Sequence, residues 1–268
     1  MLTSRRGADA SVLQRDRAAR AGRDRLQPGT PAASPRKVAC SECKMREHCL
    51  PCDLTHGELE VLDGRFVAHL RKVARGDTLF RAGDRFDAVF PIWTGFFKSV
   101  FTSEQGLEQV TGFHMFGELL GLGGIDRGRH LVDAVALEDS QVCVVPYAGL
   151  AALASELPKL QMHLHRVMSR EIAGDHAAML QLGSMHAEER LAAFLLNLVD
   201  RLQARGFSES SLLLRMSREE IGSYLGLKLE TVSRTFSKFQ AVGLLFVRQR
   251  DIEIVDPVGL QQVLGPRR

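Results

Sequence analysis

Apolar positions between Val73 and Pro146 gather in short runs that are separated by polar positions and glycines. Between Val73 and Pro146, runs rich in β-branched and aromatic residues are separated by single glycines and by a cluster at Gly121–Gly124. Short strands at such intervals, with glycine turns, are typical of a small barrel or sandwich. The predicted strands are Thr78–Phe80, Val89–Trp93, Phe96–Phe101, Gln109–Phe113, Leu131–Ala136 and Gln141–Val145. A short helix at Thr55–Phe66 is expected to make apolar contacts through Leu59, Val61, Leu62 and Phe66.

The apolar spacing then changes and predicts one long helix from Leu157 to Leu182, with two apolar stripes. The first stripe contains Leu160, Leu164 and Val167. The second contains Met168, Ile172, Asp175, Met179 and Leu182, at spacings of 4, 3, 4 and 3, which is the seam of a two-stranded coiled coil. Such a helix can pack on its own domain with one stripe and on a second copy of the chain with the other.

Asp175 places a carboxylate within the second stripe. Across a twofold axis it would face its own copy, and two carboxylates about 4 Å apart repel by roughly 4 kcal/mol at an effective dielectric of about 20. The alternative is that Asp175 points outward into water. The first arrangement predicts a dimer that is weakened by its own charge.

The last eighty or so residues carry the signals of a compact helical unit. Ala187–Ala204 is amphipathic, and Ser217 and Glu220 form a capping box that begins another helix. Gly226 allows a sharp turn before a second helix at Lys228–Ala241. The amphipathic helix Ala187–Ala204 is expected to bury Leu191, Phe194, Leu195 and Leu198. Two β-type runs, Leu244–Arg248 and Ile252–Val255, follow as a predicted wing hairpin.

The predicted Lys228–Ala241 helix has one apolar and one polar face. The apolar face contains Val232, Phe236 and Phe239, and the polar face contains Glu230, Ser233, Arg234 and Ser237. A short polar face of this composition on a second helix suits base reading in a major groove. Lys238 and Arg248 are better placed for phosphate contacts, which add affinity without choosing sequence. The alternative is an ordinary solvated amphipathic helix.

Four of the five cysteines lie in the segment Val38–Asp53. They are Cys40, Cys43, Cys49 and Cys52, and the fifth is Cys143. Three thiolates from one loop and one from a distant position make four, the number that a tetrahedral zinc ion or a four-iron cluster needs. A chain without a secretory segment is expected to keep its thiols reduced. The spacing alone leaves zinc, including a purely structural zinc loop, and iron–sulfur open.

Composition and charge add three points. With 268 residues, 45% hydrophobic and 25% charged, the chain should form about two domains of ordinary soluble composition. No apolar run reaches the roughly 18 residues that span a membrane, so a cytoplasmic protein without membrane segments is expected. Residues 1–38 carry nine Arg or Lys against three Asp, which predicts a disordered basic arm that either contacts DNA or is a solvated tail.

Enzymatic motifs are absent from the sequence. The glycine cluster reads G-L-G-G-I-D and lacks the Walker lysine, and neither H-E-x-x-H nor G-x-S-x-G occurs. The sequence therefore predicts a binding protein and not an enzyme.

The order of cysteine loop, small barrel, long helix and winged helix-turn-helix resembles the cyclic-AMP receptor protein (CRP) superfamily, and within it the FNR oxygen-sensing regulators. The resemblance covers about residues 38–265. Its most specific segments are C-x2-C-x5-C from Cys40, S-Q-V-C-V-V-P around Cys143, E-I-A-G-D from Glu171, A-E-E-R-L-A-A-F from Ala187 and E-T-V-S-R from Glu230.

The resemblance implies an α+β fold with a cyclic-nucleotide-binding-like β-barrel sensor domain, a long dimerisation helix and a C-terminal winged helix-turn-helix. The expected parts are a disordered basic arm (1–37), a cysteine loop with the barrel (38–157), the dimerisation helix (158–184) and the DNA-binding domain (185–268).

The resemblance also implies a cofactor, an oxygen-labile [4Fe–4S] cluster held by Cys40, Cys43, Cys49 and Cys143. Cys52 departs from the family pattern and is expected to be inert, the alternatives being a resolving thiol or a substitute ligand in C-x5-C-x2-C. His48, His163, His165 and His186 are expected to be surface side chains. A zinc- or thiol-redox-responsive regulator of the same fold is the alternative.

Partners follow from the same resemblance. Glu230, Ser233 and Arg234 would read a TTGAT-type half-site, so a homodimer would bind an inverted repeat. The turn Thr102–Glu108 resembles a surface that contacts RNA polymerase. Cyclic nucleotides are not expected as ligands, because Arg129 in G-R-H-L-V-D lacks the neighbouring hydroxyl that would help to hold the phosphate.

Overall fold

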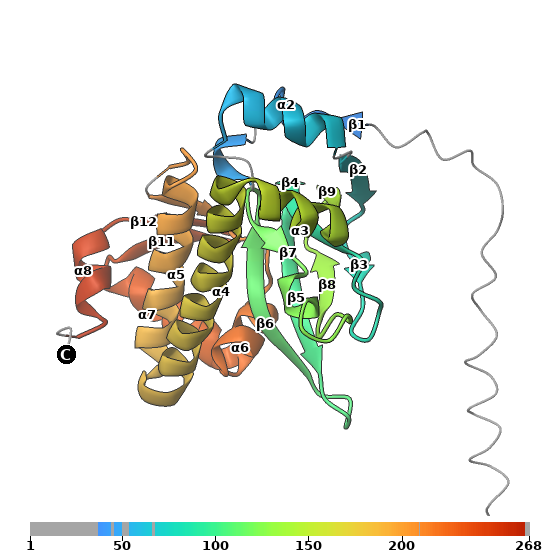
Figure 1. The fold of residues 1–268 in the computed structure, drawn as a ribbon. Helices are drawn as coiled ribbons and strands as arrows, with labels where there is room; N and C mark the ends of the chain where they lie inside the picture. Colours follow the sequence, from blue (N-terminus) through green and yellow to red (C-terminus); the bar gives the residue numbers. More distant parts are fainter. Residues whose placement is uncertain (1–36, 44–45, 50–53, 66–67, 209, 266–268) are drawn as a thin grey trace, which may run out of the picture. The chain divides into compact units, whose positions relative to one another are not determined.

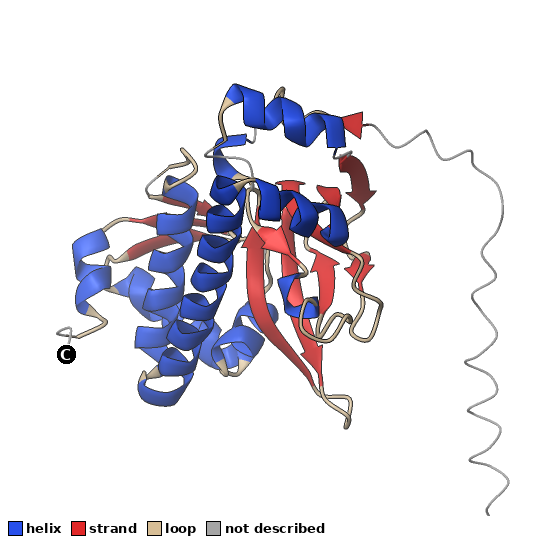
Figure 2. Cartoon of the chain, in the orientation of Figure 1, coloured by secondary structure: helices blue, strands red, loops and turns tan. Residues whose placement is uncertain are grey.

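The computed structural model describes residues 37–43, 46–49, 54–65, 68–208 and 210–265, and Figures 1 and 2 show their arrangement. Residues 1–36 of the predicted basic arm lie outside the described residues, as do Cys52 and Phe66. Lys37, which the sequence assigned to the arm, begins strand β1 (Lys37–Val38).

Two antiparallel sheets form the N-terminal part of the structure, which confirms the predicted barrel or sandwich. The first sheet has the order β1-β2-β9-β4-β7, and the second has the order β3-β8-β5-β6. A shared core lies between them, with Ile92 and Val142 from the first sheet and Phe97 and Ala134 from the second. The strands are β2 (Ala68–Val73), β3 (Thr78–Phe80), β4 (Ala88–Thr94), β5 (Phe96–Thr102), β6 (Glu108–Met115), β7 (Leu119–Leu120), β8 (Asp133–Ala136) and β9 (Ser140–Pro146).

Helices cover the outer face of the first sheet. Leu59, Leu150 and Leu160 come from three successive helices and pack in one cluster with Val89 and Val145 of the sheet. These helices are α2 (His56–Arg65), α3 (Tyr147–Glu156) and α4 (Pro158–Ser184). Figure 1 shows α3 beside strands β4 and β9, with the long helix α4 following it.

The C-terminal part is a winged helix-turn-helix, as predicted. The capping box is present, because Ser217 Oγ accepts from Glu220 N at 3.1 Å and Glu220 Oε2 accepts from Ser217 N at 2.6 Å. Gly226 ends the first helix in the left-handed region at φ 62°. The elements are α5 (Ala187–Gln203), β10 (Ser211–Leu213), α6 (Arg218–Leu225), α7 (Leu229–Ala241), β11 (Leu245–Arg248), β12 (Asp251–Ile254) and α8 (Pro257–Gln262).

The second sheet is buried on both faces. Its outer side chains, including Val100 and Phe113, join a single apolar cluster with Leu191 and Phe194 of α5 and Phe236 of α7. The C-terminal part therefore packs directly on the β5–β6 pair of its own chain. A β-bulge between Ser99 and Val100 adjusts which side chains of β5 face each layer.

The long helix α4 is longer than predicted by two residues at its C-terminus and presents two different stripes. Leu160 and Leu164 are buried against the first sheet. In the second stripe Ile172, Met179 and Leu182 are 56%, 70% and 42% exposed. A single copy of the chain therefore leaves the predicted dimer seam uncovered.

Some sequence predictions were wrong or incomplete. Val61 was expected to make apolar contacts but is 43% exposed. His163 was predicted to lie on the surface but is only 7% exposed. Strand β2 was not predicted, because its sequence A-H-L-R-K-V carries three basic or imidazole side chains. Helix α3 was not predicted either, because its sequence Y-A-G-L-A-A-L-A-S-E contains a glycine and lies directly before the longer helix. Within the described residues, no helix combines the length and hydropathy that a membrane span requires.

Candidate metal centre and nucleic-acid interface

The cysteine loop is wound by consecutive turns. Cys43 N donates to Cys40 O at 3.3 Å, Arg46 N donates to Cys43 O at 3.1 Å, and Cys49 N donates to Arg46 O at 3.3 Å. Asp63 of α2 fastens the start of the loop, since its carboxylate accepts from Cys40 N at 2.6 Å and from Ser41 N at 3.0 Å. The three described loop cysteines therefore lie at successive turn junctions beside α2.

Cys143 lies on β9, where it is 8% exposed and paired across from Leu70 of β2. It belongs to the apolar cluster on the outer face of the first sheet. Cys40 and Cys49 pack against the same cluster. The fold thus places the loop on the face of the sheet that carries the distant cysteine, as the sequence hypothesis requires.

The thiols influence one another electrostatically. Burial raises the pKa of Cys40 to about 12, with further contributions from the charges of Asp63, Cys143 and Cys43. Burial also raises the pKa of Cys143 to about 11, followed by the charge of Cys43. Cys40, Cys43 and Cys143 are therefore close enough to repel as thiolates, and a bound cation would relieve that repulsion.

The described residues do not form a finished metal cage. Among them, no group of three or more His, Cys, Asp or Glu side chains has an arrangement that could hold a metal ion as it stands. The donor chemistry nevertheless fits a thiolate-bound metal or iron–sulfur cluster, since three thiols converge and a fourth, Cys49, packs against the same cluster.

Trp93 supports this fit. Its indole Nε1 is buried and has no hydrogen-bond partner among the residues that the structure describes. Trp93 follows Ile92, which pairs with Val142 beside Cys143, and its ring packs against the same cluster as Cys40 and Cys49. A buried donor without an acceptor is costly, and a thiolate or sulfide sulfur would supply an acceptor in this region. No sequence pattern pointed to Trp93 as part of this site.

His48 was predicted to be a surface side chain, and this prediction was wrong. The side chain is only partly exposed, and its ring lies edge-on to Phe116, with ring centroids 6.2 Å apart and an interplanar angle of 88°. The residue beside Cys49 is therefore a contact between the cysteine loop and the end of β6. His165 and His186 are exposed, as predicted.

The predicted recognition face of α7 is open to solvent. All four of its residues are exposed, and so is Lys238, whose ammonium group pairs with the carboxylate of Glu188 on α5. The polar face comprises Glu230, Ser233, Arg234 and Ser237. Arg234 is exposed, and among the described residues no side chain of another element holds its guanidinium, so this group is free to reach a base edge.

Arg218 holds the recognition unit together, which the sequence did not indicate. Its guanidinium carbon lies 3.3 Å from the ring centroid of Phe236 on α7, and Nη2 donates to Gln249 O in the wing turn at 3.4 Å. Burial lowers the pKa of Arg218 to about 10. One side chain therefore links α6, α7 and the wing.

The predicted dimer residues do not all share one environment. Asp175 is exposed, whereas Met168 is half-buried against the apolar cluster of its own domain. One helical turn before Asp175, burial raises the pKa of Glu171 to about 7, together with the charges of Glu118 and Asp175, and the charge of Arg201 opposes this rise. The carboxyl group of Glu171 therefore lies close enough to Asp175 on α4 to be influenced by its charge.

The barrel interior was predicted not to bind a cyclic nucleotide. Arg129 Nη1 donates to Gly83 O at 2.6 Å. The adjacent His130 is 4% exposed and stacks on Phe80, with ring centroids 3.8 Å apart. The arginine is thus engaged by the backbone, and an imidazole fills the space beside it.

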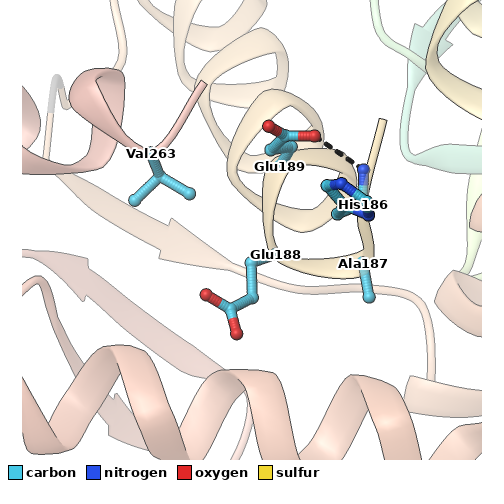
Figure 3. A pocket seen from close by; sticks show the side chains of 5 residues that line it. All are labelled: His186, Ala187, Glu188, Glu189 and Val263. Carbon is cyan, nitrogen blue, oxygen red and sulfur yellow. Dashed lines mark hydrogen bonds between the residues drawn. The ribbon is translucent and has the colours of Figure 1, made fainter. Parts of the chain in front are cut away.

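A pocket of about 460 Å³ lies at the start of α5 (Figure 3). It is lined by His186, Ala187, Glu188, Glu189 and Val263. Glu189 Oε2 accepts from His186 N at 2.6 Å, and Glu188 pairs with Lys238. Because both carboxylates have partners within the chain, we assign no ligand to this pocket.

Two family descriptions match the chain. A Crp-like helix-turn-helix domain matches residues 189–263, and a cyclic nucleotide-binding domain matches residues 70–156. Among solved structures, FixK2 from Bradyrhizobium japonicum superposes with a TM-score of 0.70 at 29% identity, covering 75% of this chain and all of that one.

Curated relatives align over most of their length. The transcriptional regulatory protein btr of Bordetella pertussis is 44% identical over 87% of this chain and 96% of its own. The transcriptional activator protein Anr of Pseudomonas protegens is 45% identical over 84% of this chain and 92% of its own. The fumarate and nitrate reduction regulatory protein of Escherichia coli is 41% identical over 86% of this chain and 92% of its own.

The position of Trp93 generates a prediction about the metal. Trp93 is the only tryptophan in the chain, so intrinsic indole fluorescence reports on this site alone. Anaerobic loading with iron and sulfide is expected to quench the emission strongly, because a coloured cluster accepts excitation energy from a nearby indole. Zn²⁺ is colourless and is expected to leave most of the emission. Equal responses to both titrations would mean that Trp93 does not report on the metal centre.

Proposed function

The chain belongs to the CRP/FNR family of transcription regulators, and we propose that it is an oxygen-responsive regulator that carries a [4Fe–4S] cluster. Like the family, it is a DNA-binding transcription regulator and not an enzyme. Cys40, Cys43, Cys49 and Cys143 would hold the cluster. As a homodimer with the cluster bound, it would bind an inverted-repeat operator.

The observation that carries this proposal is that Cys40 and Cys49 of the loop pack against the apolar cluster that contains Cys143. The charges of Cys143 and Cys43 reach Cys40, and Cys49 packs against the same apolar cluster. When bound there, the cluster would supply an oxygen-labile centre. The thiolates would hold it, and α2 would fix the loop through Asp63.

A zinc- or thiol-redox-responsive regulator remains the second candidate. Four thiols also suit Zn²⁺. We favour iron because the C-x2-C-x5-C segment and the strand context of Cys143 resemble the FNR regulators, and because a relative at 41% identity is named for fumarate and nitrate reduction.

The proposed switch acts through dimerisation. When the four thiols share a metal centre, the loop is anchored on the first sheet, against which α4 also packs. The exposed side chains of Ile172, Met179 and Leu182 would then pair with a second copy, against the repulsion of Asp175. A marginal interface of this kind lets a coupling of a few kcal/mol shift the population between monomer and dimer.

The proposed DNA complex uses α7 in the major groove. Glu230, Ser233 and Arg234 would read a TTGAT-type half-site, and the twofold axis would place two such helices about one DNA turn apart. The tip of the β5–β6 hairpin, where Leu107 is 69% exposed, would contact RNA polymerase. Acting on DNA, the protein would be cytoplasmic, without a cyclic nucleotide or a membrane as partner.

The cofactor assignment is tested by anaerobic purification with iron, sulfide and visible absorption measurements. Cys143→Ser is expected to abolish cluster content, because the strand position cannot be replaced by another described cysteine. Cys40→Ser, Cys43→Ser and Cys49→Ser should do the same. Cys52→Ser is the matched control and should retain full iron. A Cys143→Ser protein with full iron and sulfide would contradict the ligand set, and zinc without sulfide in the unchanged protein would favour the alternative.

The dimer switch is tested by Asp175→Ala. Removing the paired carboxylates is expected to strengthen self-association about tenfold or more, so that dimers and operator binding persist in air without the cluster. Sedimentation measures the association. Asp126→Ala, which removes an exposed carboxylate outside α4, should leave the protein monomeric in air. An aerobic Asp175→Ala monomer would show that Asp175 points into solvent in the dimer.

Base reading is tested by comparing Arg234→Ala with Lys238→Ala. Arg234 can bond both acceptors of a guanine, a contact worth about 1–3 kcal/mol of discrimination. Its loss should weaken the inverted repeat and remove the preference at that guanine. Lys238→Ala should weaken all sequences alike and reduce the salt dependence. Competition binding against single-base operator changes distinguishes them, and an undiminished guanine preference in Arg234→Ala would mean that the recognition face is misassigned.

A further inference from the structure

We propose that the turn Phe116–Glu118, between β6 and β7, is a joint that transmits the state of the cysteine loop to the DNA-binding domain of the same chain. This inference rests on the proposed function only in treating the cysteine loop as the sensor. It adds a second route to the dimer switch, because it acts within one copy of the chain.

The loop side of the joint is a close contact with His48. The imidazole lies edge-on to the ring of Phe116 at 6.2 Å. Gly117 has φ +80°, and a Cβ there would lie 2.9 Å from His48 Cβ and 3.2 Å from His48 O. The same Cβ would lie 3.4 Å from Arg205 Nε. Gly117 therefore fits between the cysteine loop and the arginine that follows α5, and a larger residue would push them apart.

The other side of the joint is a paired-arginine clamp on Glu118. Arg201 Nε donates to Glu118 Oε1 at 3.0 Å and Arg201 Nη2 donates to Oε2 at 2.6 Å, which is a two-point contact. Arg205 Nη2 donates to Oε1 at 2.9 Å, and Arg205 Nε donates to Phe116 O at 2.8 Å. Both arginines therefore hold the turn that His48 touches.

The clamp is sheltered from water. The side chains of Glu118 and Arg205 are 17% and 14% exposed, and that of Arg201 is 28% exposed. Burial alone would raise the pKa of Glu118, but the charge and hydrogen bonds of Arg201, followed by the charge of Arg205, hold it below its usual value. Loss of one partner would leave a poorly solvated charge, which is strongly destabilising.

The turn itself is rigidly attached to the first sheet. Gly117 N donates to Ile92 O at 2.9 Å, and Ile92 N donates to Glu118 O at 2.8 Å. Met115 N donates to Glu118 Oε2 at 3.0 Å. Because the turn is fixed in place, His48 on one side and the arginines on the other pack against the same three residues, and a change at this turn affects both contacts.

The DNA-binding domain is held at separate points on the second sheet. Lys98 of β5 pairs with Glu220 of α6 at 2.7 Å, and Val110 N donates to Ser223 Oγ at 2.9 Å. Neither contact touches the cysteine loop. When His48 leaves Gly117 and Phe116, the clamp end of α5 loosens while the α6 end stays attached, and α7 loses its fixed orientation.

The first arm of the test uses Glu118→Gln, which keeps the size of the side chain and removes its charge. Hydrogen exchange is followed in the stretch 199–206 and in α7, before and after anaerobic loading with iron and sulfide. In the unchanged protein, loading is expected to slow exchange there about tenfold or more. Glu118→Gln should load to the same visible absorption without that slowing. Glu138→Gln is the matched control. Glu138 forms a 3.1 Å ion pair with Arg215 of the DNA-binding domain and takes no part in the turn at Phe116–Glu118. This variant should respond like the unchanged protein. A full response in Glu118→Gln overturns the joint.

The second arm does not depend on which metal binds. Gly117→Ala should push His48 and Arg205 apart in the metal-free protein, so exchange should quicken both in the described loop residues 46–49 and in 199–206. Faster exchange in the loop alone overturns the joint. If iron and sulfide never bind the unchanged protein, the proposed function fails while this arm still decides the inference.

Discussion

Apolar burial on both faces of the second sheet is the constraint on which the rest of the structure depends. The inner face packs in the barrel core through Phe97, and the outer face packs through Val100 and Phe113 into the core of the DNA-binding domain. Each such side chain contributes about 1.5–3 kcal/mol when fully buried. The sensor and the DNA-binding domain therefore share a core, and charged contacts at its edge, such as the Glu118 clamp, can adjust the position of the domain without having to hold it alone.

The sequence predicted those parts whose signals are local. Short β-type runs between glycines marked six strands, the capping box of Ser217 marked α6, and the apolar spacing marked the long helix α4. Strand β2 escaped because its polar side chains hide the alternation, and α3 escaped because it is short and follows β9 directly. His163 was misplaced because a histidine carries no sequence mark of burial; packing within the helical layer decides it.

The candidate sites divide in the same way. The four predicted cysteine ligands rest on spacing and on a resemblance, and the fold brings three of these cysteines within electrostatic reach. The clamp could not be predicted, because Glu118 and Arg201 are 83 residues apart and neither belongs to a local pattern. Met168 matched the seam by spacing yet packs against the apolar cluster of its own domain, because a spacing shared by two stripes does not say which neighbour covers a side chain.

The Lys238–Glu188 ion pair gives the DNA-binding surface a competitor of its own. In the free chain the ammonium group already has a carboxylate partner, so a phosphate at this position would displace Glu188 and not a dissolved anion. The released carboxylate would in turn attract a cation from solution. The net number of ions released on binding to any polyanion would then be smaller than the number of phosphate contacts suggests. A contact of Arg234 with a base edge would not carry this cost, so the ion pair would shift the balance of affinity from charge toward sequence.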